Sequence, residues 1–329
     1  MNTEALVVVK IKRNEKYKSL AGNTGRSKQK IFVQMKNDWM LYVMFLPVLV
    51  WYITFCYRPM TGLVLAFKDY SYKGGIWGSE WIGLSNFQQL FADRNLVRSI
   101  RNTLILGVGG IAIGMPCEIG LALMLNELRM PRVKKFVQTT VTFPHFISWV
   151  VLAGIMTNIF SSIGVVNQVL QKLGLETIAP LTSASSYRWF IWFSEIWKNV
   201  GWGSIIYLAA ITSIDPGLYE AACIDGAGRL KQMWHVTLPS IRGTICIMLI
   251  LAVGNLILNG RFDQIFNTYS SPVYSVGDTI DTYIFRESFG NSMDFGYSTA
   301  IGVVKSVIGL VMLVVANKIV TAAGEQGLF

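Results

Sequence analysis

The sequence predicts an all-α integral membrane protein with six transmembrane helices and one long polar loop between the fourth and the fifth. Of its 329 residues, 52% are hydrophobic and 15% are charged, whereas soluble domains average about 25% charged residues. Six apolar runs follow one another, each close to the ~20 residues that a helix needs to cross a hydrocarbon core of about 30 Å. They lie at roughly 39–57, 103–125, 141–160, 189–214, 241–258 and 299–320.

The first 38 residues form a polar, basic tail with nine Lys or Arg. The apolar run after this tail begins too late for a secretory signal, and no small-residue cleavage site follows it, so we expect an uncleaved anchor. The segment before Lys30 is expected to be flexible. Pro47 and Pro116 fall inside the first and second runs and are expected to kink those helices, which packed neighbours tolerate.

Charge predicts the orientation. An even number of spans places both termini on the same side. The tail, the segments 126–138 and 215–242 and the residues after 317 hold 17 Lys or Arg, against 10 in the longer intervening segments. The positive-inside rule therefore places residues 1–38, 321–329 and the 215–242 loop in the cytoplasm. The net charge of +10 is explained by orientation and by attraction to anionic lipid, and no polar domain presents a basic face to nucleic acid.

The polar loop at 215–239, which we call the knob, carries clear helix-boundary signals. Asp215 followed by Pro216 predicts an N-cap and a first helical residue. Gly226 and Gly228 end that helix or let the chain turn. We expect two short helices at roughly a right angle, joined at 225–227 and projecting from the membrane. The small residues that allow another surface to approach the backbone are Ala221, Ala222 and Ala227.

Ionisable side chains inside the apolar runs point to a buried path. Each would cost about 2.5–3.5 kcal/mol at a lipid-facing helix centre, so they should face the bundle or a wet cavity. Glu195 and Lys198 lie one turn apart and favour a structural ion pair, and a role along the path of a polar solute is the alternative. The ionisable residues in this class are Glu118, Glu195, Lys198 and Lys305.

Amide and aromatic side chains on the fourth and fifth runs suit sugars, whose hydroxyls need hydrogen bonds and whose C–H faces stack on rings. The same residue types also pack helices together in membranes. With the ionisable groups they form a candidate substrate path: Glu195, Lys198, Asn199, Trp202, Tyr207, Asn255, Asn259 and Lys305. Gly110 and Gly114 form a G-x-x-x-G pattern that predicts close helix packing, within the chain or against a partner.

The sequence predicts neither a metal site nor a catalytic site. His145 and His235 are its only histidines and are too far apart to predict a metal cluster. Neither a P-loop nor a nucleophile–base pair is evident. The cysteines have no metal or redox spacing, and we expect them to be packing residues rather than disulfides. They are Cys56, Cys117, Cys223 and Cys246.

The knob has a compound pattern: Glu220-Ala221-Ala222, two residues, Asp225-Gly226-Ala227, ten residues, then Leu238-Pro239. It resembles the EAA loop in the permease subunits of binding-protein-dependent ABC importers. The resemblance implies the type I ABC importer permease fold, with the loop docking as a coupling helix into a cleft on a cytoplasmic ATPase. Trp234 stands where this loop often carries Phe. The residues to which the resemblance gives the coupling role are Glu220, Ala221, Ala222, Asp225, Gly226, Ala227, Trp234, Leu238 and Pro239.

Further stretches are similar to the LplB branch of maltose-type sugar permeases, and 81–87 (W-I-G-L-S-N-F) resembles the segment before the second span of such permeases. On another reading 81–87 is a Trp-rich interfacial anchor. The remaining similar stretches are 196–202, 205–210, 214–215, 281–283, 305–308 and 316–317.

This branch implies uptake of oligosaccharides, including acidic ones released from polysaccharides, by alternating access across the bacterial cytoplasmic membrane. The implied partners are a second, homologous permease, an ATPase dimer and an extracytoplasmic solute-binding protein. ATP and Mg would bind the ATPase, and this chain would hold no cofactor. The alternative is an ion-coupled secondary transporter or a channel. An ion-coupled carrier should show inverted repeats with broken helices, and none is evident. A membrane enzyme is the third class.

Overall fold

The computed structural model describes residues 37–328 apart from 259–260, 291–292 and 326. The chain forms two units, one up to Gly62 and the other from Leu63 onward. The basic tail predicted over 1–38, with its flexible segment before Lys30, lies almost wholly outside the described residues.

The described part of the first unit, residues 37–62, belongs to one apolar helical segment. It consists of α3 (Trp39–Tyr52), a π-helical turn (Ile53–Tyr57) and the start of a 3₁₀ segment (Arg58–Phe67). Helical structure therefore runs ten residues past the predicted end at 57. The large apolar side chains of α3 are exposed on every face, which is typical of a helix that crosses a membrane.

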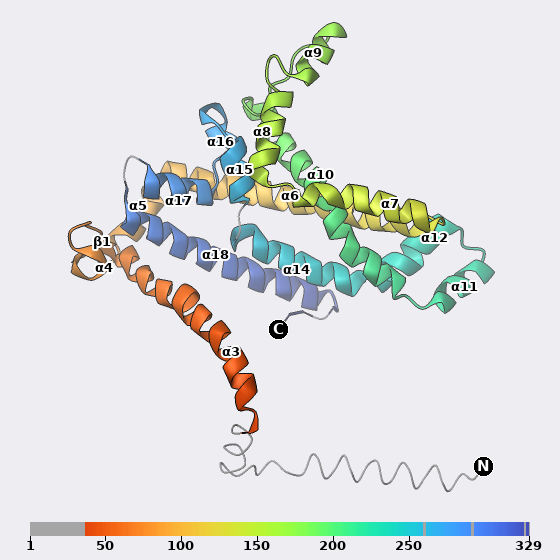
Figure 1. The fold of residues 1–329 in the computed structure, drawn as a ribbon, viewed down its shortest axis with the longest axis horizontal. Helices are drawn as coiled ribbons and strands as arrows, with labels where there is room; N and C mark the ends of the chain where they lie inside the picture. Colours follow the sequence, from red (N-terminus) through yellow and green to blue (C-terminus); the bar gives the residue numbers. More distant parts are fainter. Residues whose placement is uncertain (1–36, 259–260, 291–292, 326, 329) are drawn as a thin grey trace. The chain divides into compact units, whose positions relative to one another are not determined.

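Four long helices form the body of the second unit (Figure 1). They are α6 (Arg94–Glu127), α10 (Ala184–Thr212), α14 (Arg242–Leu258) and α18 (Phe295–Ala322). α6 packs along α10, and α14 packs along α18 and against α6. Pro116 lies inside α6 and Pro47 inside α3, and the kinks predicted at these prolines stay predictions.

Shorter elements connect these helices. A two-stranded antiparallel ribbon, β1 (Lys68–Asp69) and β2 (Glu80–Trp81), pairs Lys68 with Trp81 and Asp69 with Glu80. The connecting helices are α4 (Gly75–Gly78), α5 (Ser85–Ala92), α7 (Pro131–Thr142), α8 (Trp149–Ile159), α9 (Val165–Lys172), α15 (Phe262–Thr268), α16 (Tyr274–Gly277) and α17 (Ile280–Phe289), with 3₁₀ turns at Phe143–Phe146 and Ser271–Val273.

Within the described ranges, three helices are long and apolar enough to cross a membrane: Trp39–Phe67, Arg94–Glu127 and Phe295–Ala322. Two bent helix pairs, counted as one span each, raise the number to five. α10 has 29 residues, or about 44 Å at 1.5 Å per residue, but it is not among the five. It coincides with the predicted fourth run, and Glu195 and Lys198 lower its hydropathy.

The predicted span over 141–160 is not one straight helix. The chain turns by 97° between the segments Pro131–Phe146 and Trp149–Ile159. Pro144 lies in the 3₁₀ turn at the break, and the hydroxyl of Ser148 caps α8 by accepting from the N–H of Val151 at 3.3 Å. Since the residues around the break are mostly apolar, hydropathy alone does not reveal it.

Two ion pairs join the knob to the end of α6 and the beginning of α14 to the residues after α18. Arg229 in the knob pairs with Glu127 at the end of α6 at 2.8 Å. Arg242, which begins α14, pairs with Glu325 at 3.3 Å and donates to the carbonyl of Ala323 at 2.7 Å, just beyond α18. The knob and the C-terminal end of the chain therefore lie on the same side of the helical body. That this side is the cytoplasm stays a prediction.

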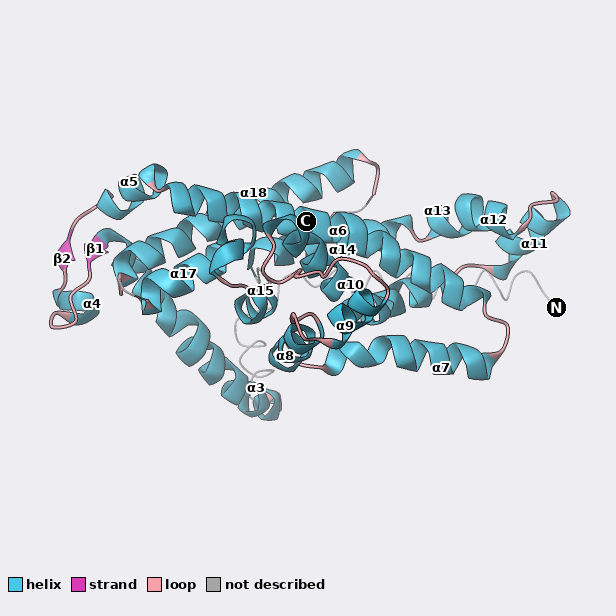
Figure 2. Cartoon of the chain, turned by 90° about the horizontal axis from the view of Figure 1, so that it is seen from above, coloured by secondary structure: helices cyan, strands magenta, loops and turns pink. Residues whose placement is uncertain are grey.

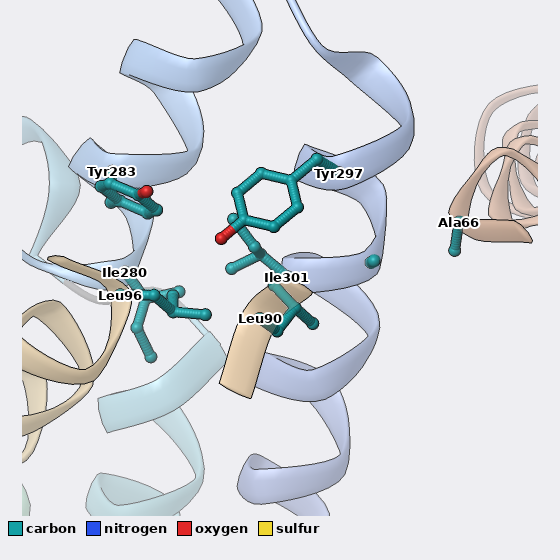
Figure 3. Close-up of a cluster of buried hydrophobic side chains, with 8 residues drawn as sticks. Ala66, Leu90, Leu96, Ile280, Tyr283, Tyr297 and Ile301 are labelled. Carbon is teal, nitrogen blue, oxygen red and sulfur yellow. The ribbon is translucent and has the colours of Figure 1, made fainter. Parts of the chain in front are cut away.

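The opposite end of the second unit, where α5 and α17 lie (Figures 1 and 2), closes around a buried cluster. Leu96 of α6 and Ile280 of α17 pack with Ile301 of α18, and Tyr283 and Tyr297 lie beside them (Figure 3). Both tyrosine hydroxyls donate to Oδ2 of Asp93, and the contact from Tyr297 measures 2.7 Å. One carboxylate therefore joins the beginning of α6 to α17 and α18.

Asp93 is also the N-cap of α6, because its Oδ1 accepts from the backbone N–H groups of Asn95 and Leu96 at 2.8 and 3.4 Å. Burial alone would raise the pKa of Asp93. The hydrogen bonds from Tyr283, Tyr297 and the two N–H groups outweigh burial and hold the pKa below its ordinary value. The ionised carboxylate is therefore the form that stabilises this end of the protein.

We expect Asp93→Asn to destabilise the folded protein, because an amide presents no negative charge to the two hydroxyls. Removing hydrogen bonds to a charged group costs about 1.5–3 kcal/mol. Thermal unfolding of the purified protein measures the change. A folded-state pKa below the unfolded one gives stability that is complete above the unfolded pKa and is lost as pH falls through the folded pKa. The difference between wild type and variant should therefore shrink below about pH 4.

Asp294 provides a matched control for this change. It is the N-cap of α18 and accepts from the N–H of Tyr297 at 2.8 Å. Asn caps helices about as well as Asp, so Asp294→Asn should have a small effect. Equal stability of wild type and Asp93→Asn at neutral pH would contradict the role given to the carboxylate.

Candidate functional site

The first helix of the knob begins and ends as its sequence predicts, and the right angle expected between its two helices stays a prediction. α11 (Pro216–Ile224) begins at Asp215, whose Oδ1 accepts from the N–H of Gly217 at 2.9 Å, with Pro216 as the first helical residue. The predicted cap is thus confirmed. Gly226 has a φ of 76°, which L-residues adopt only at a cost. The N–H groups of Gly226 and Ala227 return to the carbonyls of Cys223 and Ala222 at 3.0 and 2.9 Å and close the helix.

The return path of the knob is a second, irregular helix. α12 (Arg229–Gln232) continues into a π-helical turn (Met233–Thr237) and a short helix, α13 (Leu238–Ser240). The two arms are tied together by a 2.9 Å contact between the hydroxyls of Tyr219 and Thr237. The amide of Gln232 donates to the carbonyl of Ala227 at 2.9 Å. These contacts make the knob a unit with its own hydrogen bonds.

Most of the proposed coupling residues are accessible on this unit. Glu220, Ala221, Asp225, Gly226, Trp234 and Pro239 are exposed, and Ala222, Ala227 and Leu238 are half-buried. Large apolar side chains are exposed as well: Ile224 is 87% accessible and Trp234 is 68% accessible. These apolar groups leave the knob with a surface that a partner protein could cover.

A cavity of about 480 Å³ lies between α6, α10 and α14, the last two of which flank the knob. This volume is within the range typical of ligand sites. Four of the eight residues of the predicted substrate path line it: Glu195, Asn199, Tyr207 and Asn255. The hydroxyl of Tyr207 is buried and has no hydrogen-bond partner among the described residues.

The other four residues of the predicted path do not line this cavity. Lys198 and Trp202 support the helix break instead, and Asn259 lies outside the described residues. Lys305 forms an ion pair with Asp281 of α17. Lys305 does not line the cavity, and its charge is paired with the carboxylate of Asp281. The structure therefore gives no support for a place of Lys305 on the substrate path.

Lys198 satisfies the backbone at the helix break. Its Nζ donates to the carbonyl of His145 at 2.5 Å and lies 5.6 Å from the centre of the Trp149 ring. Backbone groups at a break in a membrane helix need such partners. The His145 ring stacks on Trp202 with centroids 4.6 Å apart. Nδ1 of His145 lies 2.8 Å from Oδ1 of Asn199.

The predicted ion pair between Glu195 and Lys198 is wrong. Glu195 accepts from the amide of Asn199 at 2.9 Å, and Lys198 is held by the carbonyl of His145. Spacing along one helix suggested the pair, but a carbonyl left open by the break in a neighbouring segment binds the lysine instead. The carboxylate of Glu195 therefore remains on the cavity wall.

Two further charged residues line the cavity, Glu118 and Arg261. Glu118 was predicted to face the bundle or a wet cavity, and its carboxylate does lie on the cavity wall. It rests against the backbone of Gly203, where a Cβ would come within 2.2 Å of Cδ. Arg261 was not predicted, because an arginine just after an apolar run is ordinarily a residue that reaches the membrane surface.

The packing role predicted for the cysteines stays a prediction. Cys56, Cys117 and Cys223 are exposed, and Cys246 is half-buried. All four are free thiols. Small apolar side chains on a membrane protein can face lipid as well as other helices, which the sequence pattern does not distinguish.

Comparison with known families decides between the classes of membrane protein. Residues 118–322 match the model of the family described as the binding-protein-dependent transport system inner membrane component. The chain belongs to this family. The matched range includes the knob and the α10 and α14 walls of the cavity. The predicted all-α type I permease fold is confirmed.

Relatives extend the similarity over nearly the whole permease. It is 39% identical over 303 residues to the polygalacturonan/rhamnogalacturonan transport system permease protein YteP of Bacillus subtilis strain 168, covering 92% of this chain and 94% of the relative. It is 40% identical over 297 residues to protein LplB of the same strain, covering 90% and 92%. The resemblance to the LplB branch is confirmed.

A solved structure has the same fold as the permease. A chain of the bacterial alginate ABC transporter, crystallised with an alginate pentasaccharide-bound periplasmic protein, superimposes with a TM-score of 0.83 at 38% identity. The match covers 91% of this permease and all of that chain. A second structure, of an ABC transporter involved in import of the acidic polysaccharide alginate, gives a TM-score of 0.81 at 39% identity.

Proposed function

We propose that this permease imports oligosaccharides, acidic ones among them, by alternating access driven by ATP hydrolysis on a separate ATPase. One observation carries the proposal: the knob directly joins α10 and α14, two of the three long helices that line the cavity. A movement of the knob is therefore passed to both of these walls. Rigid helices transmit such movements better than they absorb them.

The same arrangement supports the proposed partners. The exposed apolar surface around Ile224 and Trp234 suits the cleft of an ATPase dimer, on which ATP and Mg would bind. A second, homologous permease would complete the path, and an extracytoplasmic solute-binding protein would deliver the substrate. The alginate transporter, with its periplasmic protein, supports this assembly.

The relatives support the substrate class. YteP is named for transport of polygalacturonan and rhamnogalacturonan, and a structural neighbour is involved in import of alginate, an acidic polysaccharide. All of these substrates contain uronic acids. The family membership favours an importer of this kind over an ion-coupled carrier or a channel.

Uptake into proteoliposomes tests the proposal. The permease, its partner permease and the ATPase are reconstituted with the binding protein outside and ATP inside. A panel of neutral and acidic oligosaccharides of equal length is then offered. We expect uptake that requires ATP and an intact ATPase. Uptake driven by an ion gradient without ATP would overturn the proposed mechanism, and the absence of uptake of every oligosaccharide would overturn the substrate class.

A further inference from the structure

Arg261 lies on the cavity wall just before α15. Its backbone has a φ of 53°, in the left-handed region that costs about 1–2 kcal/mol for residues other than glycine. Its Nη1 is buried without a hydrogen-bond partner among the described residues. A strained backbone and an unsatisfied buried donor at one position are costly for the fold alone and are typical of functional sites.

Gly110 of α6 provides the space that the guanidinium occupies. A Cβ at position 110 would lie 1.9 Å from Nη2 and 2.7 Å from Cζ of Arg261. Every residue other than glycine there would displace the guanidinium. One turn further along α6, Gly114 also lines the cavity, but its Cβ would meet only Ile196, at 4.0 Å. The two glycines of the G-x-x-x-G pattern thus serve different purposes.

The charges on the cavity wall are separated along α6. Arg261 lies at Gly110, and Glu118 is eight residues further along the helix, about 12 Å at 1.5 Å per residue. No ion pair joins Arg261 to Glu118 or Glu195 in the described structure; the arginines in ion pairs are Arg229, Arg242 and Arg286. One end of the cavity is therefore cationic, and Glu118 lies toward the other end.

The chemistry of this guanidinium suits a planar anion. Its donors match a carboxylate in a bidentate arrangement, and Arg261 lines the cavity with no ion-pair partner among the described residues. Glu118 toward the other end and Glu195 on the α10 wall offer carboxylate oxygens as hydrogen-bond acceptors for sugar hydroxyls. This order favours a sugar that carries a carboxylate at one position and hydroxyl groups at the next.

We propose that Arg261, held against Gly110, is the residue by which the permease selects uronate-containing oligosaccharides over neutral ones, through its guanidinium and the sugar carboxylate. This proposal rests on oligosaccharide import as the function. A carboxylate on the partner permease is the competing ligand, and the cavity volume beside the guanidinium favours the sugar.

The test compares two sugars that differ only in charge: an oligogalacturonide and the same oligogalacturonide with its carboxyl groups methyl-esterified. Uptake of each is measured in the reconstituted complex, at saturating binding protein loaded with the sugar, and is expressed as a ratio. We expect wild type to prefer the free acid and Arg261→Gln to lower the ratio about tenfold. Arg261→Lys, which keeps the charge, should retain part of the preference.

Gly110→Ala and Gly114→Ala form a matched pair on the same helix and the same wall. Gly110→Ala should lower the ratio in the same direction as Arg261→Gln, because the added methyl group displaces the guanidinium. Gly114→Ala should leave the ratio at its wild-type value, because the space there is open. Copurification of the partner permease reports assembly of every variant.

The outcomes separate the two proposals. Wild-type uptake without preference for the free acid, or an unchanged ratio in assembled Arg261→Gln and Gly110→Ala, would overturn the role of Arg261 while oligosaccharide import stands. Loss of the partner permease from Arg261→Gln would show that the guanidinium binds a subunit, and this too would overturn the role. If wild type takes up neither sugar, the proposed function fails and the role of Arg261 fails with it.

Discussion

Gly226→Leu should abolish ATP-driven uptake while leaving the membrane helices inserted. Gly226 holds a φ of 76°, and a side chain there strains the turn by about 1–2 kcal/mol. The turn closes α11 through the N–H groups of residues 226 and 227, so its loss changes the surface offered to the ATPase. The helices that cross the membrane are not touched, because a Cβ at position 226 has no neighbour within 4 Å.

Uptake and ATP hydrolysis, measured together in proteoliposomes, report this coupling. Gly228→Leu is the matched control: a Cβ at Gly228 also meets open space, but the φ of −68° suits any residue. We expect the control to keep substantial uptake. Equal losses in both variants would show that the leucine side chain obstructs the ATPase directly. Full uptake by Gly226→Leu would remove the coupling role given to the knob.

Gly201→Ala should prevent stable folding or assembly of the permease. A Cβ at Gly201 of α10 would lie 2.1 Å from the carbonyl oxygen of Val141 and 2.7 Å from the amide nitrogen of Thr142. Both are backbone atoms of α7, so neither a rotamer change nor a small shift relieves the contact. Overpacking of this kind costs about 1–3 kcal/mol or more, and here it would move the segment that Lys198 also holds.

Gly120→Ala of α6 is the control for this change. A Cβ at Gly120 has no neighbour within 4 Å, and alanine favours a helix over glycine by about 1 kcal/mol. The control should therefore be neutral or slightly stabilising. Thermal unfolding and the yield of copurified partner permease measure both variants. A Gly201→Ala permease that matches the control in both measurements would contradict the close packing of α10 on α7.

The signals that sequence analysis reads well are local ones. The first helix of the knob is predicted closely, because Asp215 before a proline and a glycine after a short helix determine the backbone over a few positions. Hydropathy locates the helices because each must satisfy its backbone internally in lipid. The break near Pro144 escapes this method, since its neighbours are as apolar as the helix that was expected.

Tertiary contacts determine which polar side chains reach the cavity, and the sequence pattern carries little information about these contacts. Lys305 forms an ion pair with Asp281, and Lys198 donates to the carbonyl of His145. Two of the predicted path residues therefore make contacts that stabilise the fold. Arg261 reaches the cavity only because α6 presents Gly110 beside it. Neither position carries a local signal that would link one to the other.

The contacts of the Asp93 carboxylate also determine when the beginning of α6 can complete its packing during synthesis. Its two tyrosine partners are separated from it by 190 and 204 residues along the chain. A nascent chain that has inserted α6 therefore holds this group with only its two backbone N–H partners until α17 and the beginning of α18 have left the ribosome. The contacts at the beginning of an early helix thus depend on the arrival of the last one, and a chain truncated before Tyr297 lacks one of the two hydroxyl donors.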